Sequence, residues 1–222
     1  MELLRDPDAE LVAACRTPDQ DGFHPAFEAL FERYRDRTYA IAFRVVGNAN
    51  DALDVVQESF ALLFRKISSF RGDSLFSTWL FRIVTNCSID HRRRNRPGRS
   101  PALLSDHASD LDLADESMGP RDSAAVQEVG DQVQQAISQL SPKLRAVLAL
   151  RYLESMSYDE LAATLDISLG TVKSRLARAH IALEHVVRTR YPHLDVAGEL
   201  ADAESKSGDS GSELHGPMGG VG

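Results

Sequence analysis

The sequence has 222 residues, 43% of them hydrophobic, which is enough for one domain of ordinary size or for two small ones. Its net charge of -8 at pH 7 at first argues against a nucleic-acid partner. The two cysteines, Cys15 and Cys87, have no CxxC spacing and give little support to a zinc site or a disulfide framework. No metal and no cofactor are therefore expected, and both cysteines are interpreted as small apolar residues.

Membrane insertion is not expected either. No apolar run approaches the roughly 20 residues that cross a bilayer. The first residues, MELLRDPDAELVAACR, carry acids where a signal peptide needs bases. We expect a cytoplasmic protein.

The charges are unevenly distributed along the chain. Acids are concentrated in residues 100–122 and 195–222, and outside these segments bases slightly outnumber acids. Arginines cluster from Arg82 to Arg99, where Asp90 is the single acid. This cluster is a candidate phosphate-binding patch, and a solvated helix end is the alternative.

Helical periodicity dominates the first block, and strand signals are almost absent. A first helix, ended by residues 47–50, has apolar residues at spacings of three, four and seven: Phe27, Leu30, Phe31, Tyr34, Ile41 and Val45. A second is predicted from about Asp51 to Lys66, with Ala52, Val56, Phe60 and Leu63 buried on one stripe. A third is predicted to begin near Ser74, with Trp79 as a core anchor.

A segment without periodicity separates this block from the next. Residues 97–125 are rich in Pro, Gly, Ser and Asp, which predicts an interdomain linker. Helical spacing resumes with Val126, Val129, Val133, Ile137 and Leu140, and Ser141-Pro142 opens another helix. Ser157 and Glu160 form a capping-box pattern that predicts a short helix from Tyr158 to Leu165.

The short helix leads through residues 166–169 into a longer one, which is the order of a helix-turn-helix. The longer helix is predicted to bury Val172, Leu176, Ala179 and Leu183. Its outward stripe then carries hydroxyl and guanidinium groups with flanking cations, as a DNA-reading helix requires: Thr171, Ser174, Arg178, Lys173 and Arg175. An αα-hairpin with a solvated basic face is the alternative.

Three segments closely resemble the extracytoplasmic-function (ECF) sigma factors of bacterial RNA polymerase, in that family's order: DALDVVQESF, FRGDSLFSTWLFRIVTN and LSPKLRAVLALRYLESMSYDELAATLDISLGTVKSRLARA. The resemblance implies an all-α protein of two small helical domains joined by a flexible linker. We expect an N-terminal extension (1–22), a sigma region two domain (23–96), the acidic linker (97–125), a sigma region four domain with the helix-turn-helix (126–191) and a disordered tail (192–222).

The resemblance also implies what the residues do. A helix matching Asp51, Asp54, Gln57 and Glu58 docks on the beta-prime clamp of RNA polymerase. The loop Phe70, Arg71, Gly72, Asp73 and Ser74 receives a flipped base of the minus-ten element, and Asn86 and Arg93 hold the opened strand. The residues Thr171, Lys173, Ser174, Arg175 and Arg178 read the minus-thirty-five element as duplex. Asp90 departs from this pattern and is interpreted as orienting Arg93 or Arg94.

The expected function is promoter-specific transcription initiation with core RNA polymerase, in response to stress or an envelope signal. Expected partners are the beta-prime clamp and beta flap of the polymerase, promoter DNA and an anti-sigma factor. The alternative is a stand-alone helix-turn-helix regulator with a partner-sensing first domain, which would need neither the acidic helix nor the FRGDS loop. An enzyme is not expected, because the sequence has no P-loop, HExxH or GxSxG motif.

Overall fold

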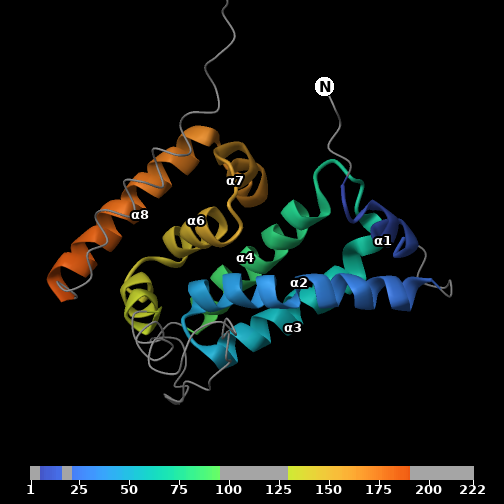
Figure 1. Cartoon of the computed structure of the whole chain (residues 1–222), viewed down its shortest axis with the longest axis horizontal. Helices are drawn as coiled ribbons and strands as arrows, with labels where there is room; N and C mark the ends of the chain where they lie inside the picture. The colour runs from blue at the N-terminus through green and yellow to red at the C-terminus, as the bar shows by residue number, and fades with distance from the viewer. Residues whose placement is uncertain (1–5, 17–21, 96–129, 191–222) are drawn as a thin grey trace, which may run out of the picture.

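The computed structural model describes residues 6–16, 22–95 and 130–190, and the described residues form helices and no strand (Figure 1). The first group consists of α1 (Ala9–Ala14), α2 (Phe23–Val46), α3 (Ala49–Lys66), the short 3-10 turn η1 (Ile67–Ser69) and α4 (Phe76–Arg94). The second group consists of a helical stretch at 130–138, α6 (Pro142–Leu153), α7 (Tyr158–Leu165) and α8 (Leu169–Arg190). The expected linker and tail lie outside the described residues, as do Val126 and Val129.

A tight turn folds α3 back against α2. Gly47 has a left-handed φ of 95°, and its N–H donates to the carbonyl of Phe43 at 2.9 Å. Such a φ strains any residue with a Cβ, which explains the glycine. Asn48 is extended and its side chain accepts the N–H of Asp51 at 2.8 Å, which caps the N-terminus of α3. The two helices therefore run antiparallel as close neighbours.

The first group encloses an aromatic and aliphatic core. Leu30, Ile41, Leu63 and Leu80 are fully buried, and the apolar stripe predicted for α3 is buried throughout. Burying each such side chain contributes roughly 1.5–3 kcal/mol. Cys15 and Cys87 are free and buried, and burial raises the pKa of both thiols, as expected for apolar packing residues.

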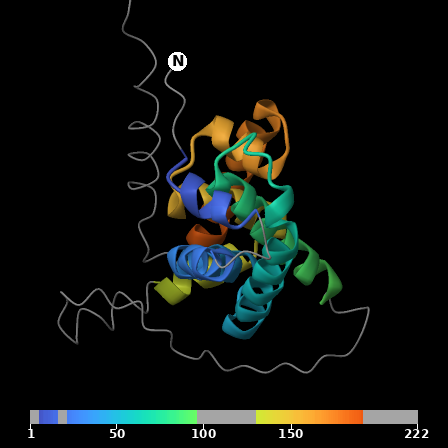
Figure 2. The same ribbon diagram turned by 90° about the vertical axis from the view of Figure 1, so that its right-hand side faces the viewer.

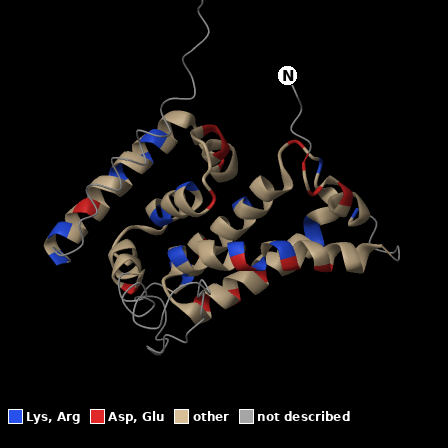
Figure 3. Cartoon of the chain, in the orientation of Figure 1, with Lys and Arg blue, Asp and Glu red and all other residues tan. Residues whose placement is uncertain are grey.

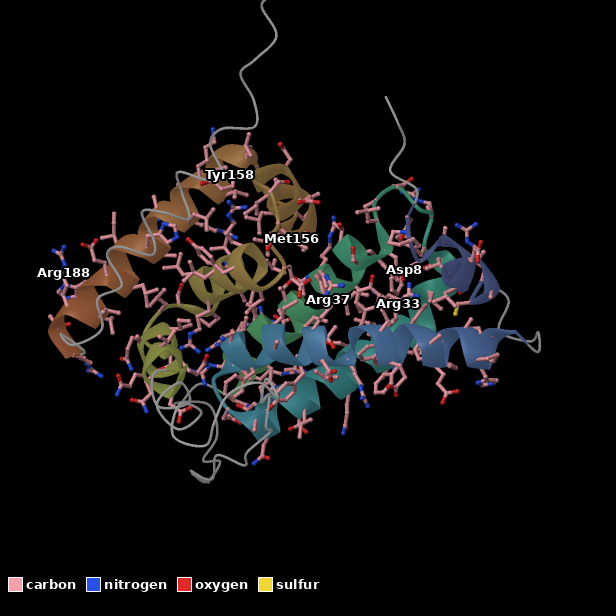
Figure 4. The ribbon with its side chains drawn as sticks, in the orientation of Figure 1. Asp8, Arg33, Arg37, Met156, Tyr158 and Arg188 are labelled. Carbon is pink, nitrogen blue, oxygen red and sulfur yellow. The ribbon has the colours of Figure 1, made fainter. Side chains whose placement is uncertain are left out.

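The N-terminal residues form a helix that was not predicted from the sequence pattern. Helix α1 packs on α2, and Asp8 is 1% exposed, bonded to Arg33 and to the hydroxyl of Tyr34 (Figure 4). Asp6 accepts the backbone N–H of Phe76 at 2.7 Å through its Oδ2 atom. Because that N–H has no partner within α4, Asp6 caps a helix that begins 70 residues later. Helix α4 therefore starts at Phe76 rather than near Ser74, where the sequence placed it.

The helix-turn-helix is confirmed in the second group. Ser157 accepts the N–H of Glu160 at 3.2 Å, and the Glu160 carboxylate accepts the N–H of Ser157 at 2.7 Å. Helix α7 ends at Leu165, and Asp166, which follows it as the C-cap, is left-handed with a φ of 54°. Thr171 donates its N–H to the hydroxyl of Ser168 at 3.1 Å, which caps the next helix. The residues predicted to face inward on α8 are all buried.

The two groups pack against each other, with α6 on α2 and α7 on α4 (Figure 2). Arg145 of α6 is 3% exposed and donates to three backbone carbonyls, those of Leu140, Ser138 and, in the first group, Val45 at 2.8 Å. Burial and, to a smaller extent, the nearby charge of Arg92 together lower the pKa of Arg145 to about 10. The guanidinium nevertheless stays charged at neutral pH and bonds the end of α2 to the second group.

A polar rim surrounds this contact between the groups. Arg37 of α2 is bonded to Glu154, and its guanidinium also lies over the rings of Tyr34 and Phe81 at 5.2 and 5.1 Å (Figure 4). Arg82 of α4 donates to the carbonyl of Ala163 in α7. Among the described helices, none has both the length and the apolar character needed to span a bilayer.

Candidate functional site

The acidic face of α3 is only partly open. Asp54 and Gln57 are exposed on the surface. Asp51 is half-buried, and its carboxylate lies 3.0 Å from Nε2 of His91 on α4. Glu58 is exposed but bonded to Arg94 at 2.8 Å. Of the four predicted docking residues, two therefore also join α3 to α4.

An apolar side chain lies within this acidic face. Leu53, next to Asp54 in sequence, is 45% exposed, although Leu30, Leu63 and Leu80 of the same group are buried. An apolar centre with a polar rim is the usual make-up of a protein interface. The α3 face therefore has the chemistry of a protein-docking surface rather than of a DNA-binding one.

The loop before α4 presents a different chemistry. Phe70 is buried and its ring stacks on Trp79 at 4.9 Å. Gly72 has a φ of 80°, a conformation that a residue with a Cβ rarely adopts, so the glycine is required for the turn. Arg71 and Asp73 are exposed and paired at 3.1 Å, and Ser74 is half-buried. The aromatic pair fixes one end of a loop whose polar side chains reach solvent.

A pocket of about 440 Å³ lies between this loop and the N-terminal residues. Phe70, Gly72 and Ser74 line it on the loop side, and Asp6 and Arg16 line it on the other. Arg16 donates to the carbonyl of Phe70 at 3.4 Å, a long hydrogen bond. No local sequence pattern marks Asp6 or Arg16, because both reach the loop only through the packing of α1.

The C-terminal half of α4 carries the predicted strand-binding residues. Asn86 is exposed, and the exposed Arg93 is paired with Asp90 at 3.3 Å. This pairing agrees with the interpretation that Asp90 orients Arg93. The last turn of α4 also contains Arg92 and Arg94, so cations gather where the helix dipole is negative.

The stripe of α8 that is predicted to read DNA is mostly open to solvent. Lys173, Ser174 and Arg178 are exposed, and lysines and arginines are distributed along the helix (Figure 3). Arg178 donates through Nε to the carbonyl of Ser174 at 3.1 Å, which leaves its terminal nitrogens available. Thr171 and Arg175 are half-buried, and the hydroxyl of Thr171 is bonded to that of Ser168 at 2.8 Å. Ser174 and Arg178 are therefore the most open members of the predicted stripe.

One cation of the arginine cluster is covered. Arg82 is half-buried under α7, and its Nε atom is buried without a hydrogen-bond partner among the described residues.

Within residues 6–16, 22–95 and 130–190, no group of three or more His, Cys, Asp or Glu is placed to hold a metal ion.

Two parts of the chain match known protein families. Residues 30–97 match the family described as Sigma-70 region 2, and residues 130–183 match Sigma-70, region 4. The ECF RNA polymerase sigma factor SigW of Bacillus subtilis is 33% identical over 182 residues, which are 77% of this chain and 91% of the relative.

Solved structures agree with the fold. CnrH, solved in complex with the cytosolic domain of CnrY, is 25% identical with a TM-score of 0.60, and the match covers 82% of this chain and 98% of CnrH. The sigma factor RpoE of Bartonella quintana, solved with the anti-sigma factor NepR, is 23% identical with a TM-score of 0.53, over 74% of this chain and 98% of RpoE.

Proposed function

Because this chain belongs to the extracytoplasmic-function sigma factors of the sigma-70 family, we propose that its two groups of helices give it separate surfaces for polymerase and for DNA. It is a sigma factor that binds core RNA polymerase and directs promoter-specific transcription initiation. The observation that carries the proposal is that the open acidic face lies on α3 and the open basic stripe on α8. The two surfaces can therefore be altered one at a time.

The polymerase-docking surface consists of Leu53, Asp54 and Gln57. All three are exposed, and none is needed for the core of the first group. Leu53 supplies apolar area, and Asp54 and Gln57 supply polar contacts at its edge. Asp51 and Glu58 contribute less directly to polymerase binding, because their carboxylates also bond to side chains of α4.

The experiment for this surface is co-purification of the full chain with core RNA polymerase. Asp54→Lys reverses one exposed charge without removing the bond between Glu58 and Arg94, and we expect polymerase binding to fall at least tenfold. The matched control is Glu28→Lys, an equal charge reversal at an exposed position of α2. Equal loss of binding in both variants, or in neither, would refute the assignment of this surface.

The minus-ten element is bound by the loop at 70–74 and by α4. The stacked Phe70 and Trp79 hold the loop in place, and the arginines after Asn86 offer a basic path for an unpaired strand. The minus-thirty-five element is bound by α8, whose N-terminal half enters the major groove with Ser174 and Arg178 outward. The residues that we assign to the two promoter elements are those predicted from the sequence. Asp6 and Arg16, which line the pocket beside the loop, were not part of that prediction.

In the structure the two groups of helices pack against each other, and we call this the docked arrangement. The two groups have to separate when the protein binds a promoter. The minus-ten and minus-thirty-five elements lie about 25 base pairs apart, on the order of 80 Å along B-form DNA. In the docked arrangement α7 rests on α4, so the two DNA-binding surfaces are neighbours. Opening would also uncover Arg82, which then joins the basic path of α4.

A protein inhibitor is the remaining partner that we propose. RpoE of Bartonella quintana was solved with an anti-sigma factor, and CnrH with the cytosolic domain of CnrY. In this chain large apolar side chains are exposed in both groups, among them Leu53 in α3 and Ile181, 67% exposed, in α8. An anti-sigma factor that covers such side chains would block the docking surface and keep the two groups together.

A further inference from the structure

One face of α8 is open along most of the helix and combines cations with an apolar side chain. Its members are all exposed and recur at spacings of four and three, and we call them the outer face of α8: Ser174, Arg178, Ile181, His185 and Arg188. Ile181 is 67% exposed, the highest value for a large apolar side chain among the described residues. It lies beyond the N-terminal half of α8 that we assign to the major groove, so that role does not account for it.

The cations of α8 are poorly balanced by acids within the helix (Figure 3). The helix carries Glu184 as its single acid against five bases: Lys173, Arg175, Arg178, Arg188 and Arg190. Glu184 is paired with Arg188 at 2.8 Å. Among the described residues, Lys173, Arg175 and Arg178 have no carboxylate partner in an ion pair. Such a row of cations attracts an anionic partner.

The chain that follows α8 carries the complementary chemistry. Residues 191–222 contain Lys206 as their single base against six acids: Asp195, Glu199, Asp202, Glu204, Asp209 and Glu213. Four of these acids are interspersed with apolar residues in the sequence LDVAGELADAE at 194–204, which we call the acidic segment. Its leucines and valine suit an exposed apolar side chain, and its carboxylates suit cations.

The acidic segment is attached close to the outer face of α8. Because α8 ends at Arg190 and a helix rises about 1.5 Å per residue, Ile181 and Arg178 lie roughly 14 and 18 Å back along the axis. An extended chain covers up to about 3.3 Å per residue, so Asp195 can lie roughly 17 Å from Arg190 and Glu199 roughly 30 Å. A short covalent connection also gives an effective concentration on the order of millimolar, so weak contacts suffice.

Building on the proposed function, we infer that the acidic segment lies along the outer face of α8 in the free protein and competes with duplex DNA for it. Its apolar residues cover Ile181, and its carboxylates pair with Arg178 and Lys173. Duplex DNA presents phosphates to the same cations and has to displace the segment. The segment is therefore an intramolecular inhibitor of DNA binding by α8.

The first test measures the affinity of the full chain for a labelled duplex of mixed sequence, by fluorescence anisotropy at several salt concentrations. The segment variant neutralises four carboxylates: Asp195→Asn, Glu199→Gln, Asp202→Asn and Glu204→Gln. It should bind the duplex about tenfold more tightly and with a steeper salt dependence, because phosphates no longer have to displace carboxylates. The matched control removes the same charge from the linker and should bind nearly as the wild type does: Asp106→Asn, Asp110→Asn, Asp112→Asn and Asp115→Asn.

A second variant separates docking of the segment from general repulsion between charges. Ile181→Ser removes the apolar contact and leaves every charge in place, so it should also tighten duplex binding, by about fivefold. Leu153→Ser, at a 42% exposed position of α6, is the control. In addition, carbodiimide cross-linking of the free wild-type chain should join the amine of Lys173 to carboxylates of the acidic segment. Added duplex should suppress this product.

The outcomes separate this inference from the function on which it rests. Equal tightening in the segment and linker variants would overturn the inference, because net charge alone would then explain the effect. Unchanged duplex binding in Ile181→Ser, or the absence of cross-links to Lys173, would also overturn it. Failure of the proposed DNA-binding role has a different result. The changes Lys173→Gln and Arg178→Gln, added to the segment variant, would then leave duplex binding unchanged, while the wild-type cross-links would persist.

Discussion

At the scale of single residues, the buried carboxylate of Asp8 attaches the N-terminal segment to the first group. It is 1% exposed and bonded to Arg33 and Tyr34, and the pKa of Tyr34 is raised by burial and then by this hydrogen bond. A charged group so far from water depends on its partners. Because α1 lines the pocket beside the loop at 70–74, this one attachment also keeps that pocket in place.

We expect Asp8→Ala to lower the free energy of unfolding by about 1–3 kcal/mol, since it removes an acceptor that serves a buried hydroxyl. Urea titration followed by circular dichroism measures the change. Glu10→Ala removes an exposed acid from the same helix and should leave the midpoint within experimental error. Indistinguishable midpoints for the two variants would mean that α1 adds nothing to the stability of the first group.

At the scale of helices, the capping box of α7 makes a local prediction. Ser157→Ala removes the side-chain acceptor for the N–H of Glu160, and loss of such a cap costs about 1 kcal/mol. We expect amide hydrogen exchange in α7 to accelerate by on the order of fivefold, the factor that corresponds to this energy. Ser157→Thr retains an acceptor and should exchange nearly as the wild type does. Equal protection in the alanine and threonine variants would count against the cap.

The bounds of helices follow from the sequence where the end signals are local. Helix α7 runs from Tyr158 to Leu165, as its capping box predicts, and Gly47 ends α2 through its left-handed backbone. The buried stripes of α3 and α8 follow from spacing alone. The ECF resemblance supplied what spacing does not, namely the kind of partner that each exposed face would bind.

Other features depend on contacts between distant residues. Helix α4 starts at Phe76 because Asp6, 70 residues earlier, accepts its N–H, and no motif near Ser74 marks that position. Arg145 bonds the carbonyl of Val45, which lies 100 residues away, and its sequence context is that of an ordinary exposed helix residue. The pocket lined by Asp6 and Arg16 exists only after α1 has packed, so sequence periodicity does not reveal it.

At the scale of the whole molecule, we expect the ion pair between Arg37 and Glu154 to hold the two groups of helices together. Arg37→Glu places two carboxylates together, so the two groups should separate and the radius of gyration from small-angle scattering should increase. The double variant with Glu154→Arg restores opposite charges and should recover the wild-type radius. Arg35→Glu, an exposed change on the same helix, is the control. An unchanged radius in Arg37→Glu would show that this contact does not hold the groups together.

The division of the molecule into two surfaces is tested most directly by mapping transcription start sites on a promoter library. Core polymerase with the wild-type chain should initiate at sites that share two elements. With Asp54→Lys few specific starts should remain. The double variant Ser174→Ala with Arg178→Ala should keep polymerase binding and the preference for the minus-ten element. Its sequence preference at the upstream element should be lost, with about 1–3 kcal/mol of discrimination lost for each base contact. Arg188→Ala, at the far end of α8, should retain both elements (Figure 4). Retention of the full upstream preference by the Ser174 and Arg178 variant, or loss of both elements together in a folded variant, would contradict the assignment of these surfaces.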